Sequence, residues 1–111
     1  MSDIYYHPEQ YGLEILGEVE APQNYEFDMF VVWKRKEDGR LFYGTDSGCS
    51  CPSPFEDEGI DDLTPIIDFS LFQRDLMQWN TSYSGTKATP TELVDLEEKT
   101  LKAFRAFQAR N

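Results

Sequence analysis

The stretch YEFDMFVVWKRKEDGRLFYGTD (residues 25–46) decides the fold, because it holds two strand patterns separated by a turn signal. In its first half, apolar side chains occupy every second position: Tyr25, Phe27, Met29, Val31 and Trp33. This period of two is typical of a β-strand and predicts a strand over about residues 25–35. Phe30 and Val32 make the other face apolar as well. We therefore expect the second half of this strand to be covered on both faces.

Asp38 and Gly39 separate this strand from a second one, which we expect over about residues 40–46. Glycine accepts a positive φ without steric cost, so Asp-Gly between two strand patterns favours a tight hairpin. With a two-residue turn, Trp33 lies opposite Gly44 in the predicted register. The indole ring would then cover the space that the glycine leaves.

A further strand is expected before the hairpin, over about residues 13–20 (LEILGEVE). Apolar and acidic side chains alternate there, which is typical of a strand with one solvent-exposed face. Leu16 and Gly17 break the alternation and indicate a β-bulge. Pro22 and Asn24 favour a turn into the hairpin. The three strands predict a three-stranded antiparallel sheet (β-β-β).

Two helix-start signals follow the strands. The first, SLFQ (residues 70–73), has the spacing of a capping box and predicts a helix over about residues 70–80. The second, TPTE (residues 89–92), adds a proline at the first helical position and predicts a helix over about residues 90–109. Both carry apolar side chains at steps of three and four. We expect one α+β domain with both helices packed on one face of the sheet.

The chain has a formal net charge of −11, which is large for 111 residues. The first 62 residues hold 15 acidic and 4 basic side chains, whereas the rest holds 6 of each. This charge disfavours direct binding to nucleic acid or to an anionic membrane and favours a protein partner with a basic surface. No apolar run approaches the roughly 18 residues of a membrane span, and the start MSDIYYHPEQ lacks the features of a signal peptide. We expect a cytoplasmic protein.

The segment DSGCSCPSPFEDE (residues 46–58) opens an acidic Cys/Pro loop over residues 46–64. Its two prolines restrict φ and present the segment in few conformations. We expect Phe55 to anchor the loop in the core, because aromatic side chains of a small domain are mostly buried; an exposed anchor for a partner is the alternative. Stiffness and charge together predict a partner-binding site. Its candidate residues are Asp46, Cys49, Cys51, Pro52, Pro54, Phe55, Glu56, Asp57 and Glu58.

The two cysteines raise the alternative of a zinc site. A closed zinc site needs four ligands. Cys49, Cys51 and the only histidine, His7, supply three, so zinc would need a carboxylate or the second subunit of a homodimer. A catalytic thiol is not expected, because the neighbouring side chains are acids rather than the bases that activate a cysteine. We therefore predict a protein without catalytic residues or a cofactor, with zinc as the alternative.

Another alternative is an acidic DNA mimic that blocks a nucleic-acid-binding protein. Mimicry requires acids in rows on one face of the protein, spaced like phosphates. The residues that could form part of such a row are Glu14, Glu18, Glu20, Glu26 and Asp28.

Three segments carry a resemblance to known proteins: YYHPEQYGLEILGEVE, YEFDMFVVWKRKEDGRLFYGTDSGCSCPSPFED and DFSLFQRDLMQW. Together they resemble a family of small, mostly uncharacterised proteins of bacteriophages that infect actinobacteria. DSGCSCPxPFE is the most specific segment, and the resemblance covers roughly residues 4–80. It implies a protein in the cytoplasm of the infected bacterial host that modulates host or phage machinery by binding. It implies no activity, cofactor or catalytic residue.

Overall fold

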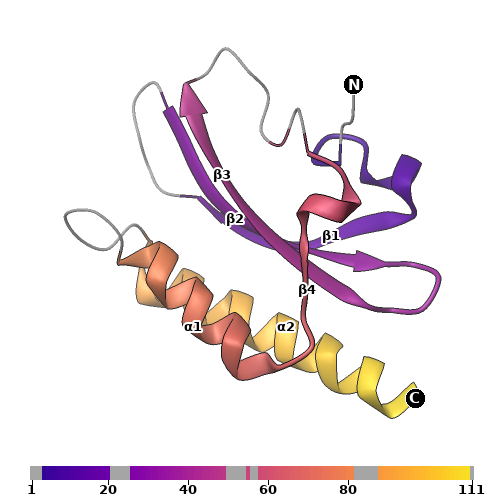
Figure 1. Ribbon diagram of the computed structural model, residues 1–111. Helices are drawn as coiled ribbons and strands as arrows, with labels where there is room; N and C mark the ends of the chain where they lie inside the picture. The colour runs from indigo at the N-terminus through magenta and orange to yellow at the C-terminus, as the bar shows by residue number, and fades with distance from the viewer. Residues whose placement is uncertain (1–3, 21–25, 50–54, 56–57, 82–87, 111) are drawn as a thin grey trace.

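The computed structural model describes residues 4–20, 26–49, 55, 58–81 and 88–110 (Figure 1). Its fold is α+β, with an antiparallel sheet of strand order β1-β2-β3-β4 and two helices. In chain order the elements are η1 (Pro8–Tyr11), β1 (Leu13–Glu20), β2 (Glu26–Arg35), β3 (Leu41–Cys49), η2 (Ile60–Asp62), β4 (Thr64–Pro65), α1 (Phe69–Asn80) and α2 (Pro90–Arg110). Figure 1 shows both helices on one side of the sheet, running in opposite directions. Neither of these helices combines the length and apolar character that a membrane span needs.

The sheet has four strands, so the prediction of three strands was wrong. The additional strand, β4, has only two residues: Pro65 pairs with Phe42, and Thr64 pairs with Tyr43. A two-residue strand shows no alternation that the sequence could reveal, and its proline argued against a strand. Proline is nevertheless tolerated at a sheet edge, where its missing N–H costs no ladder hydrogen bond.

The β2–β3 hairpin forms as predicted, but its register is shifted. Trp33 lies opposite Phe42, and Gly44 lies opposite Val31 rather than opposite Trp33. The reason is a four-residue connection over residues 36–39 in place of the predicted two-residue turn. It is closed by a 2.8 Å hydrogen bond from the backbone N–H of Arg35 to the carbonyl of Arg40.

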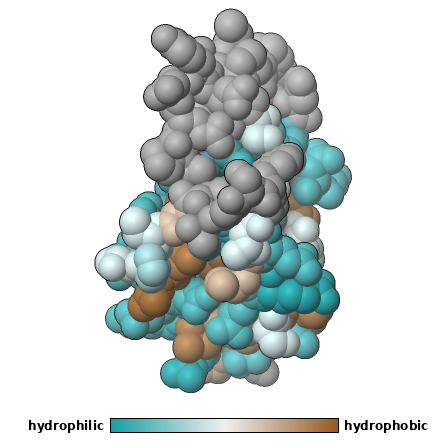
Figure 2. Space-filling model, turned by 90° about the vertical axis from the view of Figure 1, so that its left-hand side faces the viewer, coloured by the Kyte–Doolittle hydropathy of each residue, from teal (hydrophilic) through white to brown (hydrophobic). Residues whose placement is uncertain are grey.

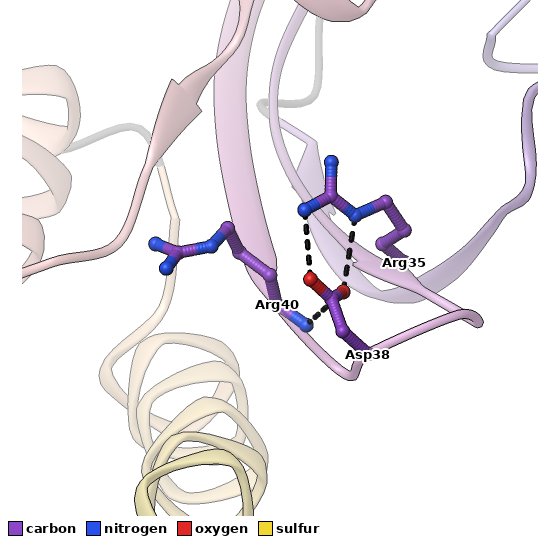
Figure 3. A network of polar contacts seen from close by, with 3 residues as sticks. All are labelled: Arg35, Asp38 and Arg40. Carbon is purple, nitrogen blue, oxygen red and sulfur yellow. Dashed lines mark hydrogen bonds and ion pairs between the residues drawn. The ribbon is translucent and has the colours of Figure 1, made fainter. Parts of the chain in front are cut away.

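Asp38 accounts for this longer turn (Figure 3). Its carboxylate accepts hydrogen bonds from Nε and Nη2 of Arg35, at 3.0 and 2.8 Å, and from the backbone N–H of Arg40 at 3.1 Å. These hydrogen bonds hold the pKa of Asp38 below its usual range, and those from Arg35 have the largest effect. The guanidinium of Arg40 points away from Asp38 and lies over the ring of Phe107 on α2, 4.9 Å from its centroid. Gly39 has a φ of 80°, which suits glycine.

The predicted bulge in β1 is confirmed. Ile15 lies opposite Trp33, and Gly17 lies opposite the next residue of β2, Val32, so Leu16 is the extra residue. The bulge also brings Gly17 against α2: a Cβ at this position would lie 2.9 Å from Cδ1 of Leu96. A side chain at this position would therefore force the end of Leu96 to move.

The helix starts were predicted unequally well. The capping box of α2 is confirmed, since the Glu92 N–H donates to Thr89 Oγ1 at 3.3 Å and the Thr89 N–H donates to Glu92 Oε1 at 3.4 Å. For α1, the predicted cap at Ser70 was wrong. Asp68 is the N-cap and accepts the Ser70 N–H at 3.0 Å. Aspartate satisfies the free N–H groups of a helix start as well as serine does, and here it lies two residues before Ser70.

The sheet separates two cores. The helix-side core consists of Val19, Phe30, Val32, Leu41, Tyr43, Ile66, Phe72, Leu76, Trp79, Ala88, Leu93, Leu96 and Phe104. Within it, the indole N–H of Trp79 donates to Asp28 Oδ1 at 2.8 Å, which ties α1 to β2. Helix periodicity predicted most of this packing.

The loop-side core covers the opposite face of the sheet, and no α-helix among the described residues packs on it. It consists of Ile4, Leu13, Met29, Val31, Trp33, Phe42, Phe55 and Leu63. The indole N–H of Trp33 donates to the Ile4 carbonyl at 2.8 Å. A Cβ on Gly44 would lie 2.9 Å from Leu63 and 3.5 Å from Phe55. Residues 30–33 of β2 are fully buried, which confirms that this part of the strand is covered on both faces.

Candidate acidic binding site

A hollow of about 560 Å³ lies on the helix side of the sheet, along β3 and beside Thr64, the first residue of β4. β3, the chain around η2, and α1 contribute its walls. It is lined by Phe30, Tyr43, Gly44, Thr45, Glu58, Asp62, Thr64, Asp75, Gln78 and Trp79. Three of these side chains are carboxylic acids, and the lining described here contains no basic side chain. We call this cavity the acidic hollow.

Tyr43 and Asp75 form one wall of the acidic hollow. The Tyr43 side chain points to the helix side of β3, and its hydroxyl donates a hydrogen bond to Asp75 Oδ2 on α1. Burial and the neighbouring Asp75 carboxylate raise the pKa of Tyr43, so its phenol stays protonated at neutral pH. Arg74 also contacts Asp75, with a 3.3 Å ion pair at the surface.

Phe55 positions Glu58 at the opposite wall. The Phe55 ring is fully buried in the loop-side core, 5.0 Å from the Trp33 ring. The Phe55 N–H donates to Asp46 Oδ2 at 2.7 Å, and its carbonyl accepts the Glu58 N–H at 3.2 Å. Phe55 has a φ of 59°, an uncommon conformation for a residue with a side chain. A buried ring and two hydrogen bonds hold this strained residue, and Glu58 follows three positions later.

Glu58 has an unusual protonation equilibrium. Burial, followed by the negative charges of Asp46 and Asp62, raises the pKa of Glu58 to about 7. Asp62 is fixed by the Gly59 N–H, which donates to its Oδ2 at 2.8 Å. A cation that entered the hollow would relieve the repulsion among these acids. The arrangement therefore suits a ligand with a positively charged donor group.

A carboxyl group that titrates near neutral pH can also transfer protons in catalysis. Such chemistry needs a reacting group or an electrophilic partner within reach. In the described lining, the hydroxyl groups belong to Tyr43, Thr45 and Thr64, and neither a thiol nor a cationic side chain accompanies them.

The structure describes only some of the residues predicted for the binding loop. Asp46, Phe55 and Glu58 are brought together as described above. The expectation that Phe55 lies in the core is confirmed, so its ring contacts Trp33 rather than a partner. Cys49 is the last residue of β3 and pairs with Glu26. The remaining candidates lie outside the described residues: Cys51, Pro52, Pro54, Glu56 and Asp57.

The residues considered for zinc are not assembled in the described part of the chain. His7 precedes η1, and its Nδ1 lies 3.3 Å from Glu9 Oε1. Among the described residues, no three His, Cys, Asp or Glu side chains are grouped as metal ligands. Because Cys51 is outside these residues, the zinc alternative stays untested.

The acids considered for DNA mimicry do not share one face. The bulge at Leu16 sets Glu14, opposite Lys34, on the helix side, and Glu18, opposite Val31, on the loop side. Asp28 is buried and holds the Trp79 indole. Glu26 has no described side chain. Glu14 and Glu18 therefore lie on opposite faces of β1, and the DNA-mimic alternative stays untested.

The predicted binding site did not include three residues of the hollow: Tyr43, Asp62 and Asp75. Asp75 follows Phe72 by three positions on α1, so the helical pattern places an acid beside the buried stripe. That position was the available signal. Asp62 belongs to the predicted acidic loop, which was its signal, whereas Tyr43 gave none, because the two-residue strand that brings them together could not be predicted.

A family model described as Domain of unknown function (DUF7574) matches residues 2–105, and the chain belongs to this family. The match spans every strand and most of α2, so the acidic hollow lies inside the family domain. The expectation of an uncharacterised family is thereby confirmed. Neither the curated proteins nor the solved structures gave a match.

Proposed function

We propose that this member of the DUF7574 family is a noncatalytic binding protein that holds a Lys- or Arg-bearing segment of a protein partner in the acidic hollow. One observation carries the proposal: Glu58, Asp62 and Asp75 line a single cavity together with the Tyr43 hydroxyl. The acidic surface and the Cys/Pro loop, which is anchored beside the hollow by Phe55, would surround the bound segment.

Size and charge both support this partner. The hollow of about 560 Å³ falls within the roughly 300–1,000 Å³ of known small-molecule sites, enough for one long side chain and adjoining backbone. Hydrogen bonds between a charged donor and a carboxylate contribute about 1.5–3 kcal/mol each. The net charge of −11 would also speed the encounter with a basic surface, most strongly at low salt.

The biological setting is a proposal as well. The resemblance to proteins of actinobacteriophages supports a phage-encoded protein in the cytoplasm of the infected host. There it would modulate host or phage machinery by occupying a basic segment of its partner.

Isothermal titration calorimetry with a probe peptide tests the proposal. The probe is a twelve-residue Gly/Ser peptide with two arginines, and the matched peptide has citrulline at both positions. We expect the full chain to bind the arginine peptide and to bind the citrulline peptide at least tenfold more weakly. Citrulline lacks the positive charge, and the loss of one charged hydrogen bond of about 1.5 kcal/mol already corresponds to about tenfold in affinity.

Two charge-matched variants locate the binding. The hollow variant is Glu58→Gln, Asp62→Asn and Asp75→Asn; the control variant neutralises three acids on α2, through Asp95→Asn, Glu97→Gln and Glu98→Gln. We expect the hollow variant to lose about tenfold or more in affinity and the control to change less than about threefold. Equal losses would mean that only net charge matters, and that result, like absent binding of the arginine peptide, would overturn the proposal.

A further inference from the structure

A second hollow adjoins the acidic hollow. It has a volume of about 370 Å³ and shares Tyr43, Thr64 and Asp75 with its neighbour. The rest of its lining is mostly apolar and comes from β4, the chain that follows it and the first turn of α1: Pro65, Ile66, Ile67 and Leu71. Arg74 and Asp68 complete it. We call this cavity the apolar groove.

Two large apolar side chains in the apolar groove are exposed. Ile67 is 74% exposed and Leu71 is 46% exposed. The preceding residue, Ile66, is buried in the helix-side core, so the extended chain turns Ile67 outward. The other large hydrophobic side chains exposed in the described part are Tyr6, Met77 and Val94, and none of these lines the groove.

On the face drawn in Figure 2, hydrophobic atoms emerge in separate areas between hydrophilic ones. Scattered apolar side chains of this kind are ordinary on a soluble domain. Ile67 and Leu71 differ, because they line one cavity that continues into the acidic hollow.

We propose that the apolar groove receives a large apolar side chain of the same segment whose Lys or Arg enters the acidic hollow. The partner would then be recognised by a basic and an apolar side chain close together in its sequence. This inference rests on the proposed function. It follows from charge complementarity, because the occupant of the groove lies beside Asp75 and must reach the carboxylates of the adjoining hollow.

A second copy of this chain fits the groove less well than a basic partner. Two copies would each bring a formal charge of −11, and their acidic hollows would lie next to the contact. An anionic lipid surface would meet the same repulsion. A basic segment gains from both hollows at once.

The test changes one residue of the arginine probe. In three probes, leucine replaces the Gly/Ser residue directly after an arginine, or the residue one or two positions further on. Each has a matched probe with serine at the same place. Burying a leucine side chain contributes about 1.5–3 kcal/mol. At least one leucine probe is therefore expected to bind the full chain about tenfold more tightly than its serine counterpart.

Variants assign this gain to the groove. Ile67→Ser with Leu71→Ser should remove the leucine gain and leave binding of the serine probe unchanged. Met77→Ser with Val94→Ser alters two other exposed apolar residues and should keep the gain. All four positions are exposed, and circular dichroism verifies that each variant is folded.

The outcomes separate the two proposals. If the arginine probe binds in the hollow but no leucine adds affinity, this inference fails and the proposed function stands. If a leucine probe binds equally well with citrulline in place of arginine, the two side chains are not recognised together and the inference is overturned. A leucine gain that survives the Ile67 and Leu71 substitutions would overturn it as well. Without binding of any probe, both proposals fail.

Discussion

The two faces of the sheet are both buried, yet they are covered by different kinds of structure. On the helix side, regular apolar stripes of α1 and α2 pack in one core with side chains of β1, β2 and β3. On the loop side, single anchors such as Ile4, Phe55 and Leu63 cover the sheet, and no α-helix of the described residues takes part. Each face buries one tryptophan and binds its indole N–H, to a carboxylate of β2 on the helix side and to a backbone carbonyl on the loop side. Dense packing therefore does not require regular covering elements.

The two faces are connected through Glu58. Its backbone is held by Phe55 of the loop-side core, whereas its side chain lines a hollow whose floor includes Phe30 and Trp79 of the helix-side core. A change on the loop side should therefore reach the acidic hollow. The following predictions use this difference between the faces.

The largest expected effect compares two fully buried phenylalanines, one from each core. Phe30→Ala removes a ring that contacts Tyr43, Phe72 and Trp79, and we expect the free energy of unfolding to fall by about 4 kcal/mol. Phe55→Ala should cost about 3 kcal/mol, because a loop can collapse into the space more easily than a strand can. Urea unfolding followed by tryptophan fluorescence measures both. A larger loss for Phe55→Ala would contradict the view of a more adaptable loop side.

A smaller effect compares the two crowded glycines. Both would bring a Cβ to 2.9 Å from the end of a leucine side chain, Leu63 for Gly44 and Leu96 for Gly17. At Gly44 the rings of Phe55 and Trp33 also lie within 3.7 Å, so the surroundings can yield less than at Gly17. We expect Gly44→Ala to lower the free energy of unfolding by about 2 kcal/mol and Gly17→Ala by about 1 kcal/mol.

Shortening Leu63 provides the control for this pair. If the clash with Leu63 causes the loss, Gly44→Ala combined with Leu63→Ala should cost less than the sum of the two single changes. Additive losses in urea unfolding would show that the crowding arises elsewhere.

The smallest expected effect concerns the residue that connects the faces. The pKa of Glu58 is about 7 in the folded protein, above its ordinary value near 4.5, so ionisation disfavours folding. The stability of the wild type should be full below pH 4.5 and should fall as the pH rises through 7. Glu58→Gln removes this loss, and we expect it to be more stable than the wild type at pH 8 by about 1 kcal/mol, since partial solvent contact weakens the effect.

Unfolding at pH 4.5, 6 and 8 measures this dependence, with Asp61→Asn as an exposed control of equal charge change. The gain from Glu58→Gln should vanish at pH 4.5. A gain that is the same at all three pH values would contradict the assigned protonation. The Asp61 control should stay within about 0.5 kcal/mol of the wild type at each pH.

The sequence predicted the elements whose side chains repeat, and it failed where single residues decide. The β1 bulge, the β2–β3 hairpin and the start of α2 followed from alternation, Asp-Gly and a capping box. The register failed because Asp38 binds Arg35 and Arg40 and thereby lengthens the turn. The prediction missed β4, because a strand of two residues is too short to show an alternating pattern.

The candidate site was predicted less well than the fold. The sequence singled out Asp46 and Glu58 as acids in a stiff loop, and it predicted the burial of Phe55. It could not supply the opposite wall, because Tyr43 and Asp75 are 32 positions apart and meet only through packing of α1 on the sheet. A site assembled across elements requires the correct topology before its members can be recognised.

The close approach of Gly17 to Leu96 has a consequence for the order of folding. It joins the first strand to the last helix, and such distant contacts form only after a large loss of chain entropy. The β2–β3 hairpin is local and should form earlier. Docking of β1 on α2 then belongs to the late steps, where weaker packing speeds unfolding more than it slows folding, as stopped-flow kinetics of the Gly17→Ala variant would measure. During synthesis, β1 leaves the ribosome well before α2. Its helix-side apolar side chains therefore stay exposed to solvent until the chain is nearly complete.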